Sequence, residues 1–347
     1  MLKRRKKTTT YKWPLKRKIL AWACAFYIVG FSCFLFLFYG PFNSFKEFWI
    51  TSAMTTMSHQ YLAKWIYSEE YIQKVLANNT IIEVDEVSDP NKIKFRTYTS
   101  TIYRNQYEKE ILTHEKDALY KVINISGVGY QGFLVAIYDP SRIHIATTAY
   151  LGERGESILT VSERENAIIA MNAGGFYDPN WDSNGALPHG TVISRGKVVS
   201  DYEDSGNGGG FIGFTNDDKF ILGNMSMHEA VAMGYRDAIE FGPYLIVNGK
   251  RSFIRGNGGW GIAPRSAIGQ RQDGIVLFLV INGRTASSLG ADMIDLCDIM
   301  ENYGAYNAAN LDGGSSSVLV INHEIVNTPV AGGINGLRDM PTFWVVV

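Results

Sequence analysis

The N-terminal segment constrains this chain more than any other feature. Ile19 to Tyr39 forms a run of 21 residues without a charged side chain. A helix of that length rises about 1.5 Å per residue and spans a bilayer core of about 30 Å. Nine Lys and Arg and no acidic residue lie between residues 3 and 18. The positive-inside rule therefore predicts a cytoplasmic tail over residues 1–18, a single-pass plasma-membrane anchor over 19–39 and an extracytoplasmic remainder. A cleaved signal peptide is the alternative, but the run is long for one and no clear cleavage site follows it.

The part of the chain beyond the anchor is acidic and poor in cysteine. Without the nine basic residues of the tail, 24 of the 33 Lys and Arg remain against 34 Asp and Glu, a net charge of about −10. This charge argues against nucleic acid as a partner. Of the three cysteines only Cys297 lies beyond the apolar run. No disulfide can form within this part, so its fold must depend on a hydrophobic core.

Two kinds of pattern follow the anchor. Residues 40–117 begin with aromatic and aliphatic residues at helical spacing and continue as a polar stretch, which predicts a juxtamembrane helical region and a linker. Residues 118–347 contain short apolar runs between glycine turns, which predict strands at 132–138, 143–147, 166–171, 191–194, 211–214, 219–222, 244–247, 275–281 and 317–321. A helix is predicted at 291–303. We expect an α+β or mixed α/β domain, rich in strands, with a mixed sheet and few helices.

The segment from Asn310 to Ser316 carries the strongest candidate site. An apolar run from 305 to 311 delivers Asp312 onto Gly313, Gly314, Ser315 and Ser316. Together with 275–281 and the helix between them, this run forms a strand–helix–strand unit, and ligands favour the carboxyl ends of parallel strands. Backbone amides of such a turn can also form an anion-binding concavity. A tight hairpin turn is the structural alternative. No cofactor is demanded, and a divalent cation at Asp312 stays open because hard cations prefer such oxygens.

Five further segments contain candidate residues. Asn172 ends an apolar run before Gly174 and Gly175, and its amide suits sugar hydroxyls or a phosphate oxygen. His189, in a Pro-x-Gly loop, and Glu240, ahead of a Gly-Pro turn, are candidate acids or bases. Arg265 and Arg284 lie near strand ends, and arginine binds phosphate through a planar fork. Each of these segments taken alone has an ordinary explanation as a turn, a surface loop or a solvated side chain.

Taken in order, these segments resemble the phosphodiester glycosidase domain, which also occurs in bacterial envelope proteins described as exopolysaccharide biosynthesis proteins. The resemblance covers about residues 120–347. Its matching features are Asn172 to Phe176, Pro188 to Gly190, Gly242-Pro243, Pro264 to Gly269, Gly283-Arg284, Asn310 to Ser316, Asn327 to Pro329 and Arg338. One departure is Ser315, which stands where the family usually has a third glycine. A Cβ there limits the approach of a ligand or forbids a positive φ.

The resemblance implies cleavage of a sugar C1–O–phosphate linkage in a phosphorylated or phosphodiester-linked glycan of the cell envelope. Asp312 would stabilise C1 or activate water, and Arg265 and Arg284 would bind the phosphate. The amide and glycine residues and the serines would hold substrate oxygens. The second acid or base stays open between Glu240, His189 and Asp178. Two other functions stay open: a non-catalytic glycan-binding or exopolysaccharide-assembly protein, and a serine hydrolase using Ser315 or Ser316, although no G-x-S-x-G motif is present.

Overall fold

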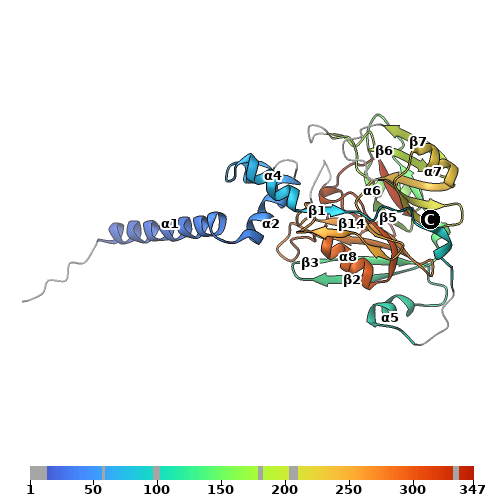
Figure 1. Cartoon of the computed structure of the whole chain (residues 1–347), viewed down its shortest axis with the longest axis horizontal. Helices are drawn as coiled ribbons and strands as arrows, with labels where there is room; N and C mark the ends of the chain where they lie inside the picture. The colour runs from blue at the N-terminus through green and yellow to red at the C-terminus, as the bar shows by residue number, and fades with distance from the viewer. Residues whose placement is uncertain (1–13, 57–58, 97–101, 179–182, 203–209, 331–335) are drawn as a thin grey trace, which may run out of the picture.

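The computed structural model describes residues 14–56, 59–96, 102–178, 183–202, 210–330 and 336–347. Its N-terminal helix, α1 (Leu15–Tyr39), projects away from the rest of the molecule as a single rod (Figure 1). Its most apolar 18-residue window has a mean hydropathy of 2.2, and none of that window is buried. The helix is therefore long and apolar enough to cross a membrane. Most of the basic tail lies outside the described residues.

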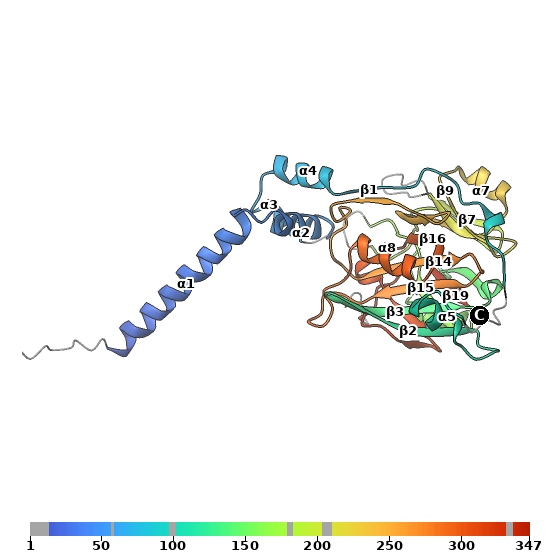
Figure 2. The same ribbon diagram turned by 60° about the horizontal axis from the view of Figure 1, so that its bottom comes forward.

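Three short helices follow α1 and pack against its C-terminal end. They are α2 (Asn43–Met54), α3 (Tyr61–Lys64) and α4 (Glu69–Asn78). Phe38 from α1 is buried among apolar side chains of these helices, and the Tyr67 hydroxyl donates to the Phe38 carbonyl over 3.0 Å. Figure 2 shows this helical cluster between α1 and the larger domain. The predicted helical spacing after the anchor thus corresponds to a small helical unit with a core of its own.

The helical unit is joined to the larger domain by specific contacts. β1 (Thr80–Ile82) pairs with β13 (Phe253–Arg255). Thr51 Oγ1 of α2 accepts a hydrogen bond from Asn257 Nδ2 over 2.7 Å, and Ser52 Oγ accepts from the Ile262 amide over 3.3 Å. A single 3-10 turn, η1 (Pro90–Lys92), and α5 (Gln106–Leu112) lie between β1 and the sheets. The segment before residue 118 is therefore held on the domain by strand pairing and hydrogen bonds, and is more than a flexible connection.

A seven-stranded sheet forms the largest layer. Its order is β12 (Lys250–Arg251), β11 (Tyr244–Val247), β16 (Ala305–Asn310), β14 (Arg265–Arg271), β15 (Val276–Ile281), β3 (Tyr130–Ile137) and β2 (Tyr120–Gly127). α8 (Met293–Asn302) packs on β11 and β16, and Asp292 caps its N-terminus together with Asp295. The expected strand–helix–strand unit is present, but β14 lies between β15 and β16 and is antiparallel to both. The site at Asp312 thus does not lie at the ends of paired parallel strands.

Two five-stranded sheets complete the domain. One has the order β18 (Glu324–Ile325), β17 (Leu319–Ile321), β5 (Ile169–Asn172), β19 (Thr342–Val346) and β4 (Ile143–Thr147). The other has the order β7 (Lys197–Tyr202), β6 (Gly190–Ser194), β10 (Tyr235–Glu240), β8 (Phe211–Thr215) and β9 (Phe220–Gly223). The turn η2 (Pro140–Arg142) precedes β4, α6 (Ile158–Arg164) covers β5 and β17, and α7 (Met227–Met233) covers β10. The α+β class, rich in strands, is confirmed.

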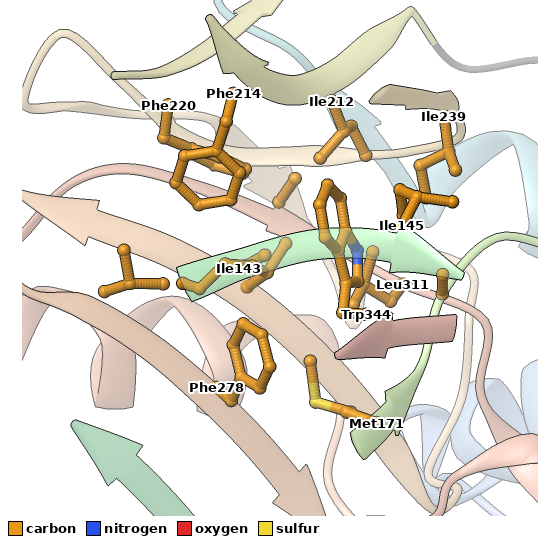
Figure 3. Packing of buried hydrophobic residues seen from close by; sticks show 14 of the residues in the cluster. Ile143, Ile145, Met171, Ile212, Phe214, Phe220, Ile239, Phe278, Leu311 and Trp344 are labelled. Atoms are coloured by element: carbon orange, nitrogen blue, oxygen red, sulfur yellow. The ribbon is translucent and has the colours of Figure 1, made fainter. Parts of the chain in front are cut away.

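The main core lies where the three sheets face one another (Figure 3). Trp344, Phe214 and Phe278, one from each sheet, are fully buried there. Burying each such side chain contributes on the order of 1.5–3 kcal/mol. Met171, Leu311 and Ile239 belong to the same cluster, and each immediately precedes a polar candidate residue: Asn172, Asp312 and Glu240. The core therefore fixes the strand ends from which the candidate site is built.

Candidate active site

Asp312 lies two residues after the end of β16, on a backbone held from two sides. Its amide donates to the Ala173 carbonyl over 3.1 Å, and its carbonyl accepts from Asn172 Nδ2 over 2.6 Å. Its own carboxylate oxygen Oδ1 accepts from the Gly313 amide over 2.9 Å. The ends of β5 and β16, from different sheets, thus meet at this residue.

Asn172 and Asn310 belong to the scaffold under Asp312. Both side chains are completely buried. Asn172 Oδ1 accepts from Ser266 Oγ over 2.7 Å and from the Val318 amide over 3.2 Å. Asn310 Nδ2 donates to the Gly242 carbonyl over 3.0 Å. These bonds lie within the protein and hold the backbone around Asp312. The predicted contact of the two amides with a substrate stays a prediction.

Charged and polar groups gather around the Asp312 carboxyl. Burial raises its pKa above the usual value, because the ionised form loses hydration. The Ser316 hydroxyl, the Arg338 guanidinium, the Gly313 amide and His189 act in the opposite direction, in that order. Ser316 itself is fully buried, which does not suit a serine that must attack a substrate. A carboxyl with a raised pKa beside cationic groups is typical of a functional site.

Arg338 enters the site from the segment before β19. Its guanidinium pairs with Asp178 and lies 4.4 Å from the centre of the Phe176 ring. Asp178 is buried, and its Oδ1 also accepts from the Ser183 amide over 2.7 Å. This carboxylate therefore orients Arg338, which makes it a poor choice for the second acid. Arg338 was only the last residue of the family pattern, and the Gly332-Gly333 and Asn335-Gly336 pairs shortly before it were not used to predict a site.

Arg265 supports the Asp312 turn from behind. It is 4% exposed, its Nε donates to the Ala291 carbonyl over 3.2 Å and its Nη2 donates to the carbonyls of Trp260 and Gly261. A Cβ on Gly313 would lie 3.6 Å from its Nη1. Burial lowers the pKa of Arg265 to about 10, with Asp292 and Asp312 opposing and Arg284 adding to the shift. The sequence predicted that the Arg265 guanidinium binds phosphate. In the structure, most of its N–H groups donate to backbone carbonyls instead.

Arg284 and the two glycines of the turn lie together. Gly314 has a φ of +63°, and a Cβ there would lie 3.6 Å from Arg284 Nη2. Gly313 is extended, with a φ of −123°. Burial lowers the pKa of Arg284, although part of its surface is exposed. Ser315 is not among the residues with positive φ, so serine fits this backbone where the family usually has glycine.

His189 and Glu240 form a wall on the side of β6 and β10. The His189 amide donates to the Gly175 carbonyl over 3.0 Å, and a Cβ on Gly175 would lie 3.3 Å from the His189 ring. The Glu240 carboxylate lies over Gly190, where a Cβ would collide with it. Burial raises the pKa of Glu240, and hydrogen bonds from Thr191 oppose the shift. Gly175 and Gly190 therefore make room for the two candidate acids or bases. Gly174 also faces this wall, because a Cβ on it would lie 3.4 Å from Ile239 of β10.

Metal ligands do not gather in this region. Within the described residues there is no group of three or more His, Cys, Asp or Glu that could hold a metal ion. The charged groups that surround Asp312 are arginines and a histidine. This donor set suits an anionic substrate group rather than a cation.

Comparisons with known proteins identify the family of this part of the chain. The model of the phosphodiester glycosidase family matches residues 165–347, which include every candidate residue. The SPbeta prophage-derived protein YomE of Bacillus subtilis (strain 168) is 29% identical over 206 residues, which are 57% of this chain and 31% of YomE. The chain thus spans about a third of that relative's length.

The fold is also similar to a solved enzyme structure. The zebrafish N-acetylglucosamine-1-phosphodiester alpha-N-acetylglucosaminidase catalytic domain, auto-inhibited by its pro-peptide, superposes with a TM-score of 0.54 and 18% identity, covering 67% of this chain and 85% of that domain. At this identity the likeness concerns the fold. The match to the family model extends over more than half of the chain. The chain belongs to the phosphodiester glycosidase family.

Proposed function

We propose that this protein is a membrane-anchored, extracytoplasmic hydrolase that cleaves the bond between C1 of a sugar and a phosphate oxygen in an envelope polysaccharide or glycoconjugate. The family supports the glycosidase activity, and α1 supports the anchor. The observation that carries the proposal is the grouping of Asp312 with Arg338, Arg265, Arg284 and His189.

The positive groups around Asp312 offset the repulsion between its carboxylate and an anionic substrate. A phosphodiester is an anion, so it is repelled by any carboxylate that must work on the adjacent sugar carbon. Arg338 and Arg284 lie beside the Asp312 turn and offset this repulsion, while the buried Arg265 adds positive charge from behind. The leaving phosphate, whose second pKa is about 6, departs as a stable anion. Stabilising it with cations and amides replaces much of the protonation that other glycosidases need.

The roles of the carboxyl groups follow from their surroundings. A carboxylate with a raised pKa is a stronger base, so Asp312 is suited to activate a water molecule or to stabilise C1 as positive charge develops. Glu240, whose pKa is also raised, is protonated to a larger extent near neutrality than an exposed glutamate. We assign Glu240 and His189 as the candidates for the second acid or base.

Asp312→Asn tests the activity directly. With purified full-length protein and a soluble sugar-1-phosphodiester, we expect the release of reducing sugar to fall by about 10³-fold or more, the usual loss for a reacting carboxylate. Asp217→Asn, at an exposed turn between β8 and β9, is the matched control. Undiminished hydrolysis by a folded Asp312→Asn protein would contradict the assignment. Lack of hydrolysis by the unmodified protein would favour a glycan-binding function.

The orientation is tested separately. If α1 anchors the chain with its basic tail in the cytoplasm, protease added to intact cells removes the domain but leaves the tail protected. The mass of the purified protein distinguishes this anchor from a cleaved signal peptide. A mature protein that begins after residue 39 would show that the segment is removed.

A further inference from the structure

An open pocket of about 420 Å³ lies between the juxtamembrane segment and the larger domain. Leu76, Ile81 and Glu83 line it from the α4–β1 side, and Pro243 and Trp260 line it from the domain side. Its volume falls in the range of about 300–1,000 Å³ that is common for ligand sites. The α4–β1 wall precedes residue 165, where the family match begins, so this pocket includes a part of the chain outside the family domain.

The pocket adjoins the scaffold of the candidate active site. Gly242, in its lining, accepts a hydrogen bond from Asn310, which lies two residues before Asp312. The carbonyl of Trp260, also in its lining, accepts from Arg265 Nη2. Two site residues therefore hold the domain side of the pocket in place.

The lining has the chemistry of a sugar site. Trp260 is half-buried and offers a flat apolar face, and Thr80 and Glu83 offer a hydroxyl and a carboxylate to sugar hydroxyl groups. Glu83 is the one ionisable side chain among the lining residues, and the Tyr244 amide donates to it. The Arg265 guanidinium lies 5.7 Å from the centre of the Trp260 ring, but it donates to the carbonyls of Trp260 and Gly261 and is not part of the lining. The lining itself therefore presents one carboxylate and neutral groups, which favour a neutral ligand over phosphate.

We propose that this pocket binds an uncharged sugar unit, and that this unit is part of the substrate on the far side of the phosphodiester. The binding of a neutral sugar follows from the lining alone. The placement of that sugar within the substrate rests on the proposed function. The juxtamembrane segment would thereby select extended glycans over small phosphodiesters.

Binding is measured first, by calorimetric titration of the full-length protein in detergent micelles with chitotriose, maltotriose and cellotriose. We expect at least one trisaccharide to bind. Glu83→Gln keeps the shape of the side chain but removes a charged hydrogen-bond acceptor, and we expect it to weaken trisaccharide binding about tenfold. Trp260→Ala removes a stacking face and should weaken binding by about the same factor. Glu70→Gln, on the exposed face of α4, is the matched control and retains affinity. Failure of all three sugars to bind, or equal binding by Glu83→Gln, overturns the proposal.

Kinetics then separate the pocket from the proposed activity. Two sugar-1-phosphodiesters are compared, one with a methyl group and one with a neutral trisaccharide beyond the phosphate. Glu83→Gln should raise KM for the long substrate about tenfold more than for the short one. Equal effects on both substrates overturn the placement of the sugar. The Asp312→Asn protein should lose hydrolysis but bind the free trisaccharide with unchanged affinity. Binding therefore tests the pocket, and hydrolysis tests the proposed activity, each without the other.

Discussion

The two walls around Asp312 use the same residue types in different ways. On the inner wall, the side chains of Arg265, Asn172 and Asn310 are buried. Arg265 and Asn310 donate to backbone carbonyls, and Asn172 accepts from the Ser266 hydroxyl. On the outer wall, Arg338 and Arg284 remain partly exposed beside the turn. The comparison teaches that an arginine or asparagine in a family motif can be a support as well as a ligand. Burial and bonding partners distinguish the two roles.

Arg265→Met should have the largest effect, and it should be on folding. Removing the guanidinium leaves the carbonyls of Trp260, Gly261 and Ala291 without this donor. We expect the free energy of unfolding to fall by about 3–5 kcal/mol, as for other buried charged hydrogen-bond donors. Denaturant unfolding of the protein measures this, and Arg255→Met at an exposed position is the control. A stable Arg265→Met protein with impaired phosphate binding would place Arg265 on the outer wall instead.

Arg338→Ala should mainly reduce activity. Loss of a cation beside the reacting carboxyl should lower kcat/KM by about 100-fold, or about 2.7 kcal/mol in the transition state. Arg338→Lys should recover part of this loss because the charge is kept.

Asp178→Asn is the companion measurement for Arg338. If Asp178 orients Arg338 through their ion pair, the loss should be smaller, about tenfold, and the shape of the pH–rate profile should not change. A lost limb of that profile would instead identify Asp178 as the second acid.

Asn172→Ala tests the inner wall by its hydrogen bonds. The substitution removes the donor to the Asp312 carbonyl and the acceptor for Ser266 and Val318. We expect a loss of about 2 kcal/mol in the free energy of unfolding, with a reduced kcat because Asp312 is less well positioned. Asn216→Ala, at an exposed turn, should change neither quantity. A large rise in KM with unchanged stability would indicate direct substrate contact after all.

The smallest effect concerns pH and stability. Glu240 and Asp312 have raised pKa values in the folded protein. The unfolded chain therefore releases these protons at lower pH, and stability falls as pH rises from the usual carboxyl pKa through the raised ones. Glu240→Gln should remove part of this decline, so that its thermal midpoint relative to wild type is higher at pH 7 than at pH 4. An equal difference at both pH values would contradict the raised pKa.

Local patterns were sufficient for much of the fold. Each of the nine predicted strand segments contains a strand, and the predicted helix at 291–303 corresponds to α8. Alternating or continuous apolar residues and glycine turns carry this information within a few residues. β2, β7, β10 and β19 lie outside the nine predicted segments. Arg236 and Asp237 interrupt the apolar pattern of β10, whereas β19 is a strand-like run that the prediction omitted. The order of strands in the sheets could not be predicted from local patterns. β14 lies between β15 and β16 because it pairs with both, and such pairings join segments that are distant in the sequence.

The sequence by itself determined the anchor-length segment, the strand-rich class and the family, because these depend on local composition and on the order of motifs. It also singled out Asp312. Only the tertiary structure decided that Asn172, Asn310 and Arg265 are buried, that Arg338 and Asp178 form a pair, and that the juxtamembrane segment lines a pocket. The physical reason is that burial and hydrogen-bond partners are set by contacts between residues far apart in the chain, which no local pattern records.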